Sequence, residues 1–238
     1  MLGGMPALDE ILQRHSVWRG GALARRADAL PSGFAVLDAQ LPGGGWPRGG
    51  LTELLLDEAG IGELELVLPA LAALTAVARR VVWISPPYLP YAPALMAASV
   101  DLTHLLVVRP ASRREALWAA EQALRSGSRH ALAAWLRKPR YPDLQRLAVA
   151  AEAGQAAAFL FRPLAAADEA SPACLRLALE AAGRELGVRI VKRRGAPAAA
   201  TLRLPLKRPF HALGRAAIPG AAAPDARDAR RLGLPVHA

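Results

Sequence analysis

The sequence predicts an α/β fold with a mostly parallel central sheet flanked by helices and extended by antiparallel strands near the C-terminus. First, residues 30–68 have the order helix, glycine turn, strand, glycine-containing turn, helix, which is how phosphate-binding α/β proteins build their site. Second, short apolar runs such as VVWIS at 81–85 alternate with helical segments, as buried parallel strands do. Third, the apolar period changes to two after Cys174, which indicates antiparallel strands.

The first half of the predicted domain begins with a helix. Ser32 is the expected cap of a helix to about residue 41, and glycines in PGGGWPRGG then break the pattern. Apolar spacing and apolar runs predict the remaining elements: a strand at 51–56, a helix at 62–78, and strands at 81–85 and 105–109. Tyr88 and Tyr91 lie on a proline-rich turn, where protein recognition and packing on the next helix are both open interpretations.

The second half continues the alternation before it changes character. The patterns predict a helix at 115–125, a strand at 131–136, a helix at 143–153 and a strand at 159–161. Leucine, valine and isoleucine then alternate with other residues at 175–179, 188–190 and 202–206, with 195–200 as a connecting loop. These three segments are the expected antiparallel extension of the sheet.

Composition divides the chain into three parts. We expect an N-terminal helix or arm at 1–28, one α/β domain at 29–206 and a flexible basic tail at 207–238, which is rich in Ala, Pro, Gly and Arg. Arg230, Arg231, Leu232 and Leu234 form a candidate docking segment in that tail. The single cysteine fits a reducing compartment, and the chain has neither a secretory signal nor an apolar run of about 18 residues. We therefore expect a cytoplasmic protein that does not enter the membrane.

Positive charge is concentrated near the C-terminus. The formal charge is +10, and residues 184–238 hold 12 basic and 3 acidic side chains. Lys192, Arg193 and Arg194 are the densest basic cluster of the predicted domain and the best candidates for nucleic-acid or partner contacts. Basic residues on an edge strand also prevent association between sheets, and we favour that interpretation.

The loop after the first strand lacks the chemistry of a nucleotide site. A P-loop reads G-x-x-x-x-G-K-[ST]: its backbone N–H groups hold the phosphates, the Lys neutralises their charge and the hydroxyl holds magnesium. Aligned on residues 57–64, Asp57 replaces the first Gly, Gly62 matches the second, and Glu63 and Leu64 replace Lys and Ser/Thr. Like charges a few Å apart cost about 4 kcal/mol per pair at an intermediate dielectric. The loop is therefore predicted to repel ATP.

Residues 30–53, LPSGFAVLDAQLPGGGWPRGGLTE, resemble the segment that opens the RecA-type recombinase core. The similarity continues to about residue 206, and LPGGGWPRG, WISPPYLPYAPAL and WAAEQALRSG together resemble the ImuA family of SulA/RecA-like translesion-synthesis accessory proteins. The resemblance implies a RecA-like core. It also places Pro87 at a catalytic Glu, Trp135 at a magnesium-binding Asp and Pro163 at a polar phosphate sensor.

The resemblance implies a non-catalytic accessory protein of SOS-induced translesion synthesis, without a cofactor or metal. Its implied partners are an ImuB-type inactive Y-family polymerase homologue and an error-prone DnaE-type polymerase. RecA, DNA held by the basic C-terminal region and a second copy held by the N-terminal arm are further candidates. One alternative is a SulA-like cell-division inhibitor. The other is an ATPase in which Lys138, Lys192 or Lys207 substitutes for the missing P-loop Lys.

Overall fold

The computed structural model describes residues 29–127, 129–136, 138–194 and 201–206. The predicted arm at 1–28 and the tail at 207–238, with Arg230, Arg231, Leu232 and Leu234, lie outside the described residues. The two boundaries of the domain therefore stay predictions. Among the described residues, none of the helices has the combination of length and apolar composition that a membrane span needs.

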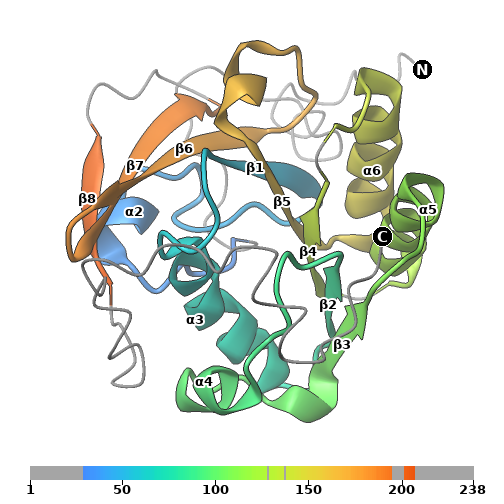
Figure 1. Cartoon of the computed structure of the whole chain (residues 1–238), viewed down its shortest axis with the longest axis horizontal. Coiled ribbons are helices and arrows are strands. Elements are labelled where there is room, and N and C mark those ends of the chain that lie inside the picture. Colours follow the sequence, from blue (N-terminus) through green and yellow to red (C-terminus); the bar gives the residue numbers. More distant parts are fainter. Residues whose placement is uncertain (1–28, 128, 137, 195–200, 207–238) are drawn as a thin grey trace, which may run out of the picture. The chain divides into compact units, whose positions relative to one another are not determined.

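Short apolar segments form one eight-stranded sheet within the described residues (Figure 1). The strands are β1 (Gly50–Leu56), β2 (Val81–Ile84), β3 (Leu105–Val108), β4 (Ala131–Trp135), β5 (Ala157–Pro163), β6 (Leu175–Ala182), β7 (Glu185–Lys192) and β8 (Leu202–Pro205). Their order in the sheet is β3-β2-β4-β5-β1-β6-β7-β8. The predicted α/β class, with a mostly parallel sheet extended by antiparallel strands, is confirmed.

The change from parallel to antiparallel pairing falls one strand later than predicted. β6 pairs parallel to β1, with Leu54 opposite Leu177, and only its other edge pairs antiparallel, with β7. β8 then pairs antiparallel with β7. The period of two in residues 175–179 therefore came from a parallel strand. Because strand period reports which side chains face a core and not strand direction, the pattern alone could not separate the two cases.

Helices cover both faces of the sheet. They are α2 (Ala35–Asp38), α3 (Glu63–Thr75), α4 (Ala92–Ala97), α5 (Arg113–Arg125) and α6 (Tyr141–Gly154), with 3-10 turns η2 (Leu102–His104) and η3 (Leu164–Asp168). The first helix is shorter than predicted, because Ser32 forms a turn before it: its Oγ accepts a hydrogen bond from the Phe34 N–H at 3.1 Å. Phe34, not Ser32, is the residue that precedes the helix.

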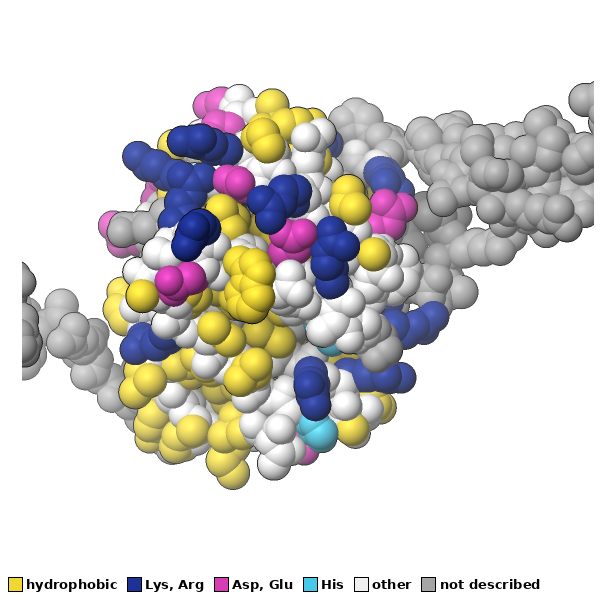
Figure 2. All heavy atoms as spheres, turned by 90° about the vertical axis from the view of Figure 1, so that its right-hand side faces the viewer, with side chains coloured by type: hydrophobic (Ala, Val, Ile, Leu, Met, Phe, Trp, Pro, Cys, Tyr) yellow, Lys and Arg dark blue, Asp and Glu magenta, His cyan; other side chains and the backbone are white. Residues whose placement is uncertain are grey.

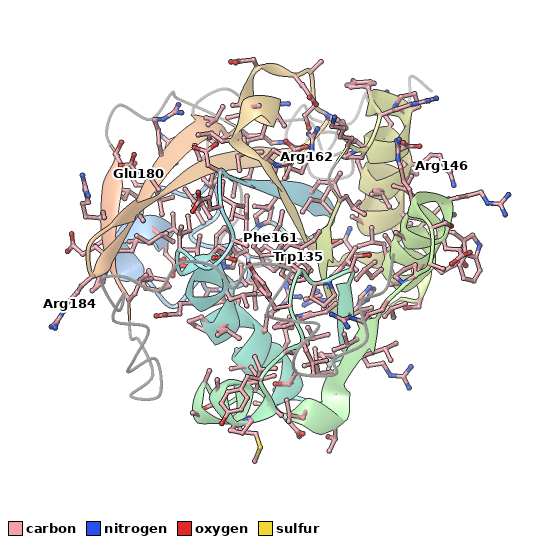
Figure 3. All side chains as sticks on the ribbon, viewed as in Figure 1. Trp135, Arg146, Phe161, Arg162, Glu180 and Arg184 are labelled. Carbon is pink, nitrogen blue, oxygen red and sulfur yellow. The ribbon has the colours of Figure 1, made fainter. Side chains whose placement is uncertain are left out.

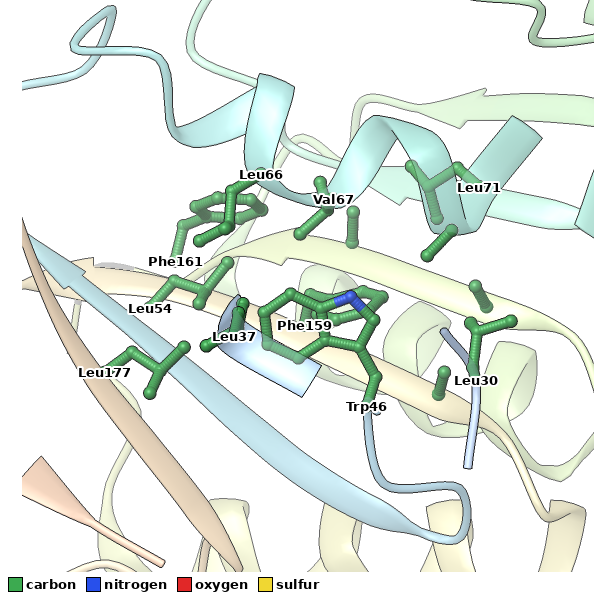
Figure 4. Close-up of a cluster of buried hydrophobic side chains, with 14 of the residues drawn as sticks. Leu30, Leu37, Trp46, Leu54, Leu66, Val67, Leu71, Phe159, Phe161 and Leu177 are labelled. Carbon is green, nitrogen blue, oxygen red and sulfur yellow. The ribbon is translucent and has the colours of Figure 1, made fainter. Parts of the chain in front are cut away.

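Two apolar clusters hold these layers together. The first lies between the sheet and α2 and α3, where the Trp46 ring packs edge-on against Phe159 at 5.2 Å (Figure 4). Leu66, Val67 and Leu71 of α3 cover the same face (Figure 4). The second cluster lies under α5 and α6 and is built largely from alanines and leucines. Small side chains on both sides of that layer allow the two helices to lie close to the sheet.

A buried ion network joins the three central strands on the side opposite α3. The Glu53 side chain of β1 has no exposed surface, and its two oxygens accept hydrogen bonds from Arg162 Nη1 at 2.8 Å and Arg176 Nε at 2.6 Å. The Ser171 hydroxyl donates to the same carboxylate at 2.8 Å. Arg176 also donates to the carbonyl groups of Ala166, Ala167 and Glu169. The network therefore fixes the segment after β5 across the sheet.

Replacing Glu53 by Gln is expected to lower the free energy of unfolding by about 3–5 kcal/mol, because two buried guanidinium groups lose their shared counter-charge. Urea denaturation measures the change. The matched control is Glu121→Gln, which removes a carboxylate whose partners Arg125 and Arg146 are both more than half exposed and therefore remain hydrated, so it should cost less than about 1 kcal/mol. Equal effects of the two substitutions would show that the network does not stabilise the fold.

His130 should make the fold sensitive to acid. Its ring is 3% exposed at the start of β4, and burial lowers its pKa below the ordinary value of 6.5. The unfolded chain therefore binds a proton more readily, and stability should fall as the pH drops below 6.5, by at most about 1.4 kcal/mol per pH unit for one group. His130→Gln should reduce this slope in thermal melts between pH 7.5 and 5.5. The more exposed His104→Gln should keep it, and an unchanged slope in His130→Gln would contradict the assignment.

Candidate functional site

Four neighbouring parallel strands bring the five positions that the resemblance assigns to nucleotide handling to the same end of the sheet. Asp57 follows β1, Pro87 follows β2, Trp135 ends β4 and Pro163 ends β5, and these strands are adjacent in the order β2-β4-β5-β1. Glu63 begins α3, directly after the loop that leaves β1. The carboxyl ends of parallel strands are where α/β proteins bind ligands. The predicted site is therefore one place in the fold.

The Glu63 carboxylate occupies the inside of the loop. Both of its oxygens lie 3.0 Å from the Gly60 backbone nitrogen, which donates to them, and Glu63 is 4% exposed. In a phosphate-binding loop this N–H would face the ligand. Here Glu63, the first residue of α3, supplies the anion. Its negative charge also interacts favourably with the positive N-terminal end of the helix dipole. Asp57, in contrast, is exposed on the outer part of the loop.

The outer side of the loop is covered by the segment that follows β8. A side chain at Gly62 would place its Cβ 2.2 Å from a Leu206 methyl group, so Leu206 lies directly against this glycine. Gly62 also has a φ of 104°, a left-handed conformation that favours glycine. The only P-loop glycine that the alignment retains therefore has structural reasons to be glycine. No sequence pattern indicates this contact, because Leu206 and Gly62 belong to distant segments.

Trp135 packs in a row of aromatic rings between the sheet and α3. It stacks on Phe161 with ring centres 4.5 Å apart and planes at 7°, and meets Trp83 edge-on at 5.6 Å. Trp135 and Phe161 lie side by side near the centre of the domain (Figure 3). Such pairs contribute about 0.5–1.5 kcal/mol beyond the burial of their area. An indole at the end of β4 thus fills space and offers no oxygen to a metal ion.

Pro87 and Pro163 complete the edge without adding a titratable or metal-binding group. Both are exposed at the ends of their strands. Among the lysines named for the ATPase alternative, Lys192 lies at the opposite edge, where its Nζ donates to the Ser171 carbonyl at 2.8 Å. Lys138 is exposed after β4, and Lys207 lies outside the described residues. The ATPase alternative therefore depends on Lys138 or Lys207.

The predicted basic cluster lies at the edge where the parallel strands begin. Lys192 ends β7, while Arg193 donates to the carbonyl group of Gln40 and Arg194 borders a hollow beside the start of β1. β8 pairs only with the first half of β7, from Glu185 to Val188. The second half of β7, which ends at Lys192, therefore has an edge that β8 does not cover, as expected if the basic residues prevent association between sheets. Arg193 also contacts Gln40 in the segment before β1.

Exposed apolar side chains gather on the turn after β2 and on the elements next to it. Tyr88 and Tyr91 are 68% and 62% exposed, and Leu89 between them is 77% exposed. Met96 of α4 and Leu106 of the edge strand β3 are also exposed. Figure 2 shows the face that carries α5 and α6, with hydrophobic side chains in its lower half and most Lys and Arg side chains above them. The high exposure of Tyr88 and Tyr91 argues against packing on the following helix, so protein recognition is the interpretation that it favours.

Sequence reasoning missed the Glu53 network and the contact of Arg48 with the segment before β4. Glu53, Arg162 and Arg176 each stand within a strongly apolar strand. That placement was a usable signal, because a charged residue in a buried strand requires a partner. Arg48 Nη1 donates to the Arg129 carbonyl at 3.3 Å, and nothing in the sequence around either residue indicates that pairing.

Comparison with known proteins finds similarity to SulA and RecA. The family model of the cell division inhibitor SulA matches residues 49–158, which run from β1 into β5. A RecA protein of Acholeplasma laidlawii is 34% identical over 101 residues, 42% of this chain and 30% of that protein. The SulA of Edwardsiella piscicida is 35% identical over 98 residues, 41% of this chain and 58% of that protein.

A solved structure, the crystal structure of SulA from Pseudomonas aeruginosa, is 27% identical, with a TM-score of 0.40 and coverage of 47% of this chain and 97% of that one. The chain spans less than a third of the RecA protein's length and a little over half of the Edwardsiella SulA. On the family match and the two sequence relatives, residues 49–158 are similar to the SulA family, and the chain is a distant relative of RecA and SulA proteins.

Proposed function

We propose that this chain is a non-catalytic, RecA-like accessory protein of SOS-induced translesion DNA synthesis. In this role it binds an ImuB-type Y-family polymerase homologue and an error-prone DnaE-type polymerase, and RecA is a further candidate partner. The observation that carries the proposal is the Glu63 carboxylate, which is buried against the Gly60 N–H where a nucleotide phosphate would bind. A domain with that loop acts through its surfaces.

The chemistry of the loop supports a domain without ATPase activity. A triphosphate entering the loop must displace Glu63 from Gly60 and then lies beside a carboxylate in a partly dry site, at a cost of about 4 kcal/mol per charge pair. Leu206 must also leave Gly62. Trp135 supplies no oxygen ligand for magnesium.

The extent of the similarity supports the polymerase-accessory role. The resemblance to the ImuA family runs from residue 30 to about residue 206 and includes the segments that form β6, β7 and β8. The match to the SulA family model ends at residue 158, before those strands. Tyr88, Leu89 and Tyr91 add an exposed apolar turn of the kind that binds proteins.

The second candidate is a cell-division inhibitor. Its specific support is the SulA family match over residues 49–158, together with the SulA relative at 35% identity. Both candidates need an inert core and partner-binding surfaces. Only the identity of the bound protein separates them.

Co-purification separates the two candidates. The tagged full chain, isolated from DNA-damaged cells and then mixed with purified proteins, is expected to bind the ImuB-type protein and the DnaE-type polymerase. Recovery of a tubulin-like division protein in their place would overturn the proposal in favour of the inhibitor. A chain truncated after Lys207 measures what the last residues contribute.

The exposed tyrosines can be tested in the same assay. Tyr88→Ser combined with Tyr91→Ser should weaken binding of the polymerase partner at least tenfold, because aromatic anchors of an interface each contribute about 1–2 kcal/mol. Tyr141→Ser is the matched control, since Tyr141 is 45% exposed and belongs to α6, a different element. Partner binding that survives the double substitution would place the interface elsewhere.

A further inference from the structure

We propose that a hollow at the edge where the parallel strands begin binds a phosphate group of a nucleic-acid backbone. The hollow has a volume of about 180 Å³ and is bordered by Pro42, Pro47, Arg48, Gly50, Cys174 and Arg194, among other residues. It lies where β1 and β6 begin, whereas the loop that contains Glu63 lies at the other end of β1. The proposal goes beyond the proposed function and does not depend on the fate of the nucleotide site.

Two distant segments bring positive charge to this hollow. Arg48 and Arg194 border it directly. Arg48 also donates to the carbonyl group of Arg129, which places the start of β4 beside it. Lys192 is near enough to Cys174 for its charge to act on the thiol, as Arg194 does, although burial remains the larger influence and raises the pKa of Cys174. The fold therefore assembles a cationic rim that no single stretch of sequence contains.

Among the described residues, the wall of the hollow contains no opposing charge. None of the ten residues that border it is acidic. Within the described part of the chain, no carboxylate forms an ion pair with Lys192 or Arg194. Elsewhere on the surface, arginines such as Arg113 and Arg146 do have such partners. At Lys192 and Arg194, therefore, positive charge lies beside the hollow without a carboxylate partner among the described residues.

The size and chemistry of the hollow favour a phosphate. Pockets that enclose whole organic ligands have volumes of about 300–1,000 Å³, so 180 Å³ suits one anionic group with the rest of its molecule outside. Guanidinium groups match phosphate oxygens in a fork geometry, and apolar walls such as Pro42 and Pro47 strengthen the attraction. Lys192 and Arg193 lie at the start of β6 and beside Gln40, where neighbouring phosphates of a chain would pass. A polyanion with regularly spaced charges meets all of these cations at once.

The test is binding of a fluorescent single-stranded oligonucleotide to the full chain, followed by anisotropy over a range of salt concentrations. Arg48→Gln combined with Arg194→Gln should weaken binding at least tenfold. It should also reduce the slope of log K against log salt by about 1.4, because each lost phosphate contact removes about 0.7. Arg114→Gln combined with Arg184→Gln removes the same charge from exposed positions away from the hollow, where Arg184 points outward (Figure 3), and should change binding less than twofold.

Additional variants and competitors separate the hollow from the tail and nucleic acid from an acidic protein. Arg194→Lys keeps the positive charge but loses the fork geometry of the guanidinium, so its affinity for the oligonucleotide should lie between those of the wild type and the double variant. A thermal melt verifies that each variant is folded. The proposal is overturned if the double variant binds like its control, or if Arg230→Gln with Arg231→Gln removes all binding. It is also overturned if polyglutamate competes as well as the oligonucleotide, which would indicate an acidic protein partner, or if only inorganic phosphate binds.

Discussion

The loop after β1 depends on one charge-assisted contact, in which the Gly60 N–H donates to the Glu63 carboxylate. A phosphate loop is a turn whose backbone donors wait for an external anion. In this chain the first residue of the following helix supplies the anion and is buried with it. The loop is therefore complete without a ligand, and the positive end of α3 is satisfied from within the fold.

Further contacts stabilise the domain on both faces of the sheet. The aromatic row of Trp83, Trp135 and Phe161 fills the space under the first half of α3, and Leu206 covers Gly62 from outside. On the other face, Glu53 holds β1, β5 and β6 together through two arginines. The described surface also offers an apolar turn after β2 and a cationic hollow beside the starts of the parallel strands.

The sequence predicted the strands well because the parallel ones before β6 are short apolar runs, as in VVWIS and ALAAW, and the later ones alternate with a period of two. The alignment also singled out Asp57, Glu63, Pro87, Trp135 and Pro163, which lie at or after the carboxyl ends of four neighbouring strands. The sequence could not predict the direction of β6, the turn formed by Ser32 or the contact of Leu206 with Gly62. These features depend on which distant segments meet, and local pattern carries no information about that.

Isothermal titration of the full chain with magnesium and ATP tests the central claim most directly. If Glu63 takes the place of the phosphate, the wild-type protein shows no saturable binding up to millimolar ATP. Saturable, magnesium-dependent binding at micromolar concentration that Gly62→Asp abolishes would contradict the account, because it would show that a nucleotide still enters the loop that the carboxylate closes.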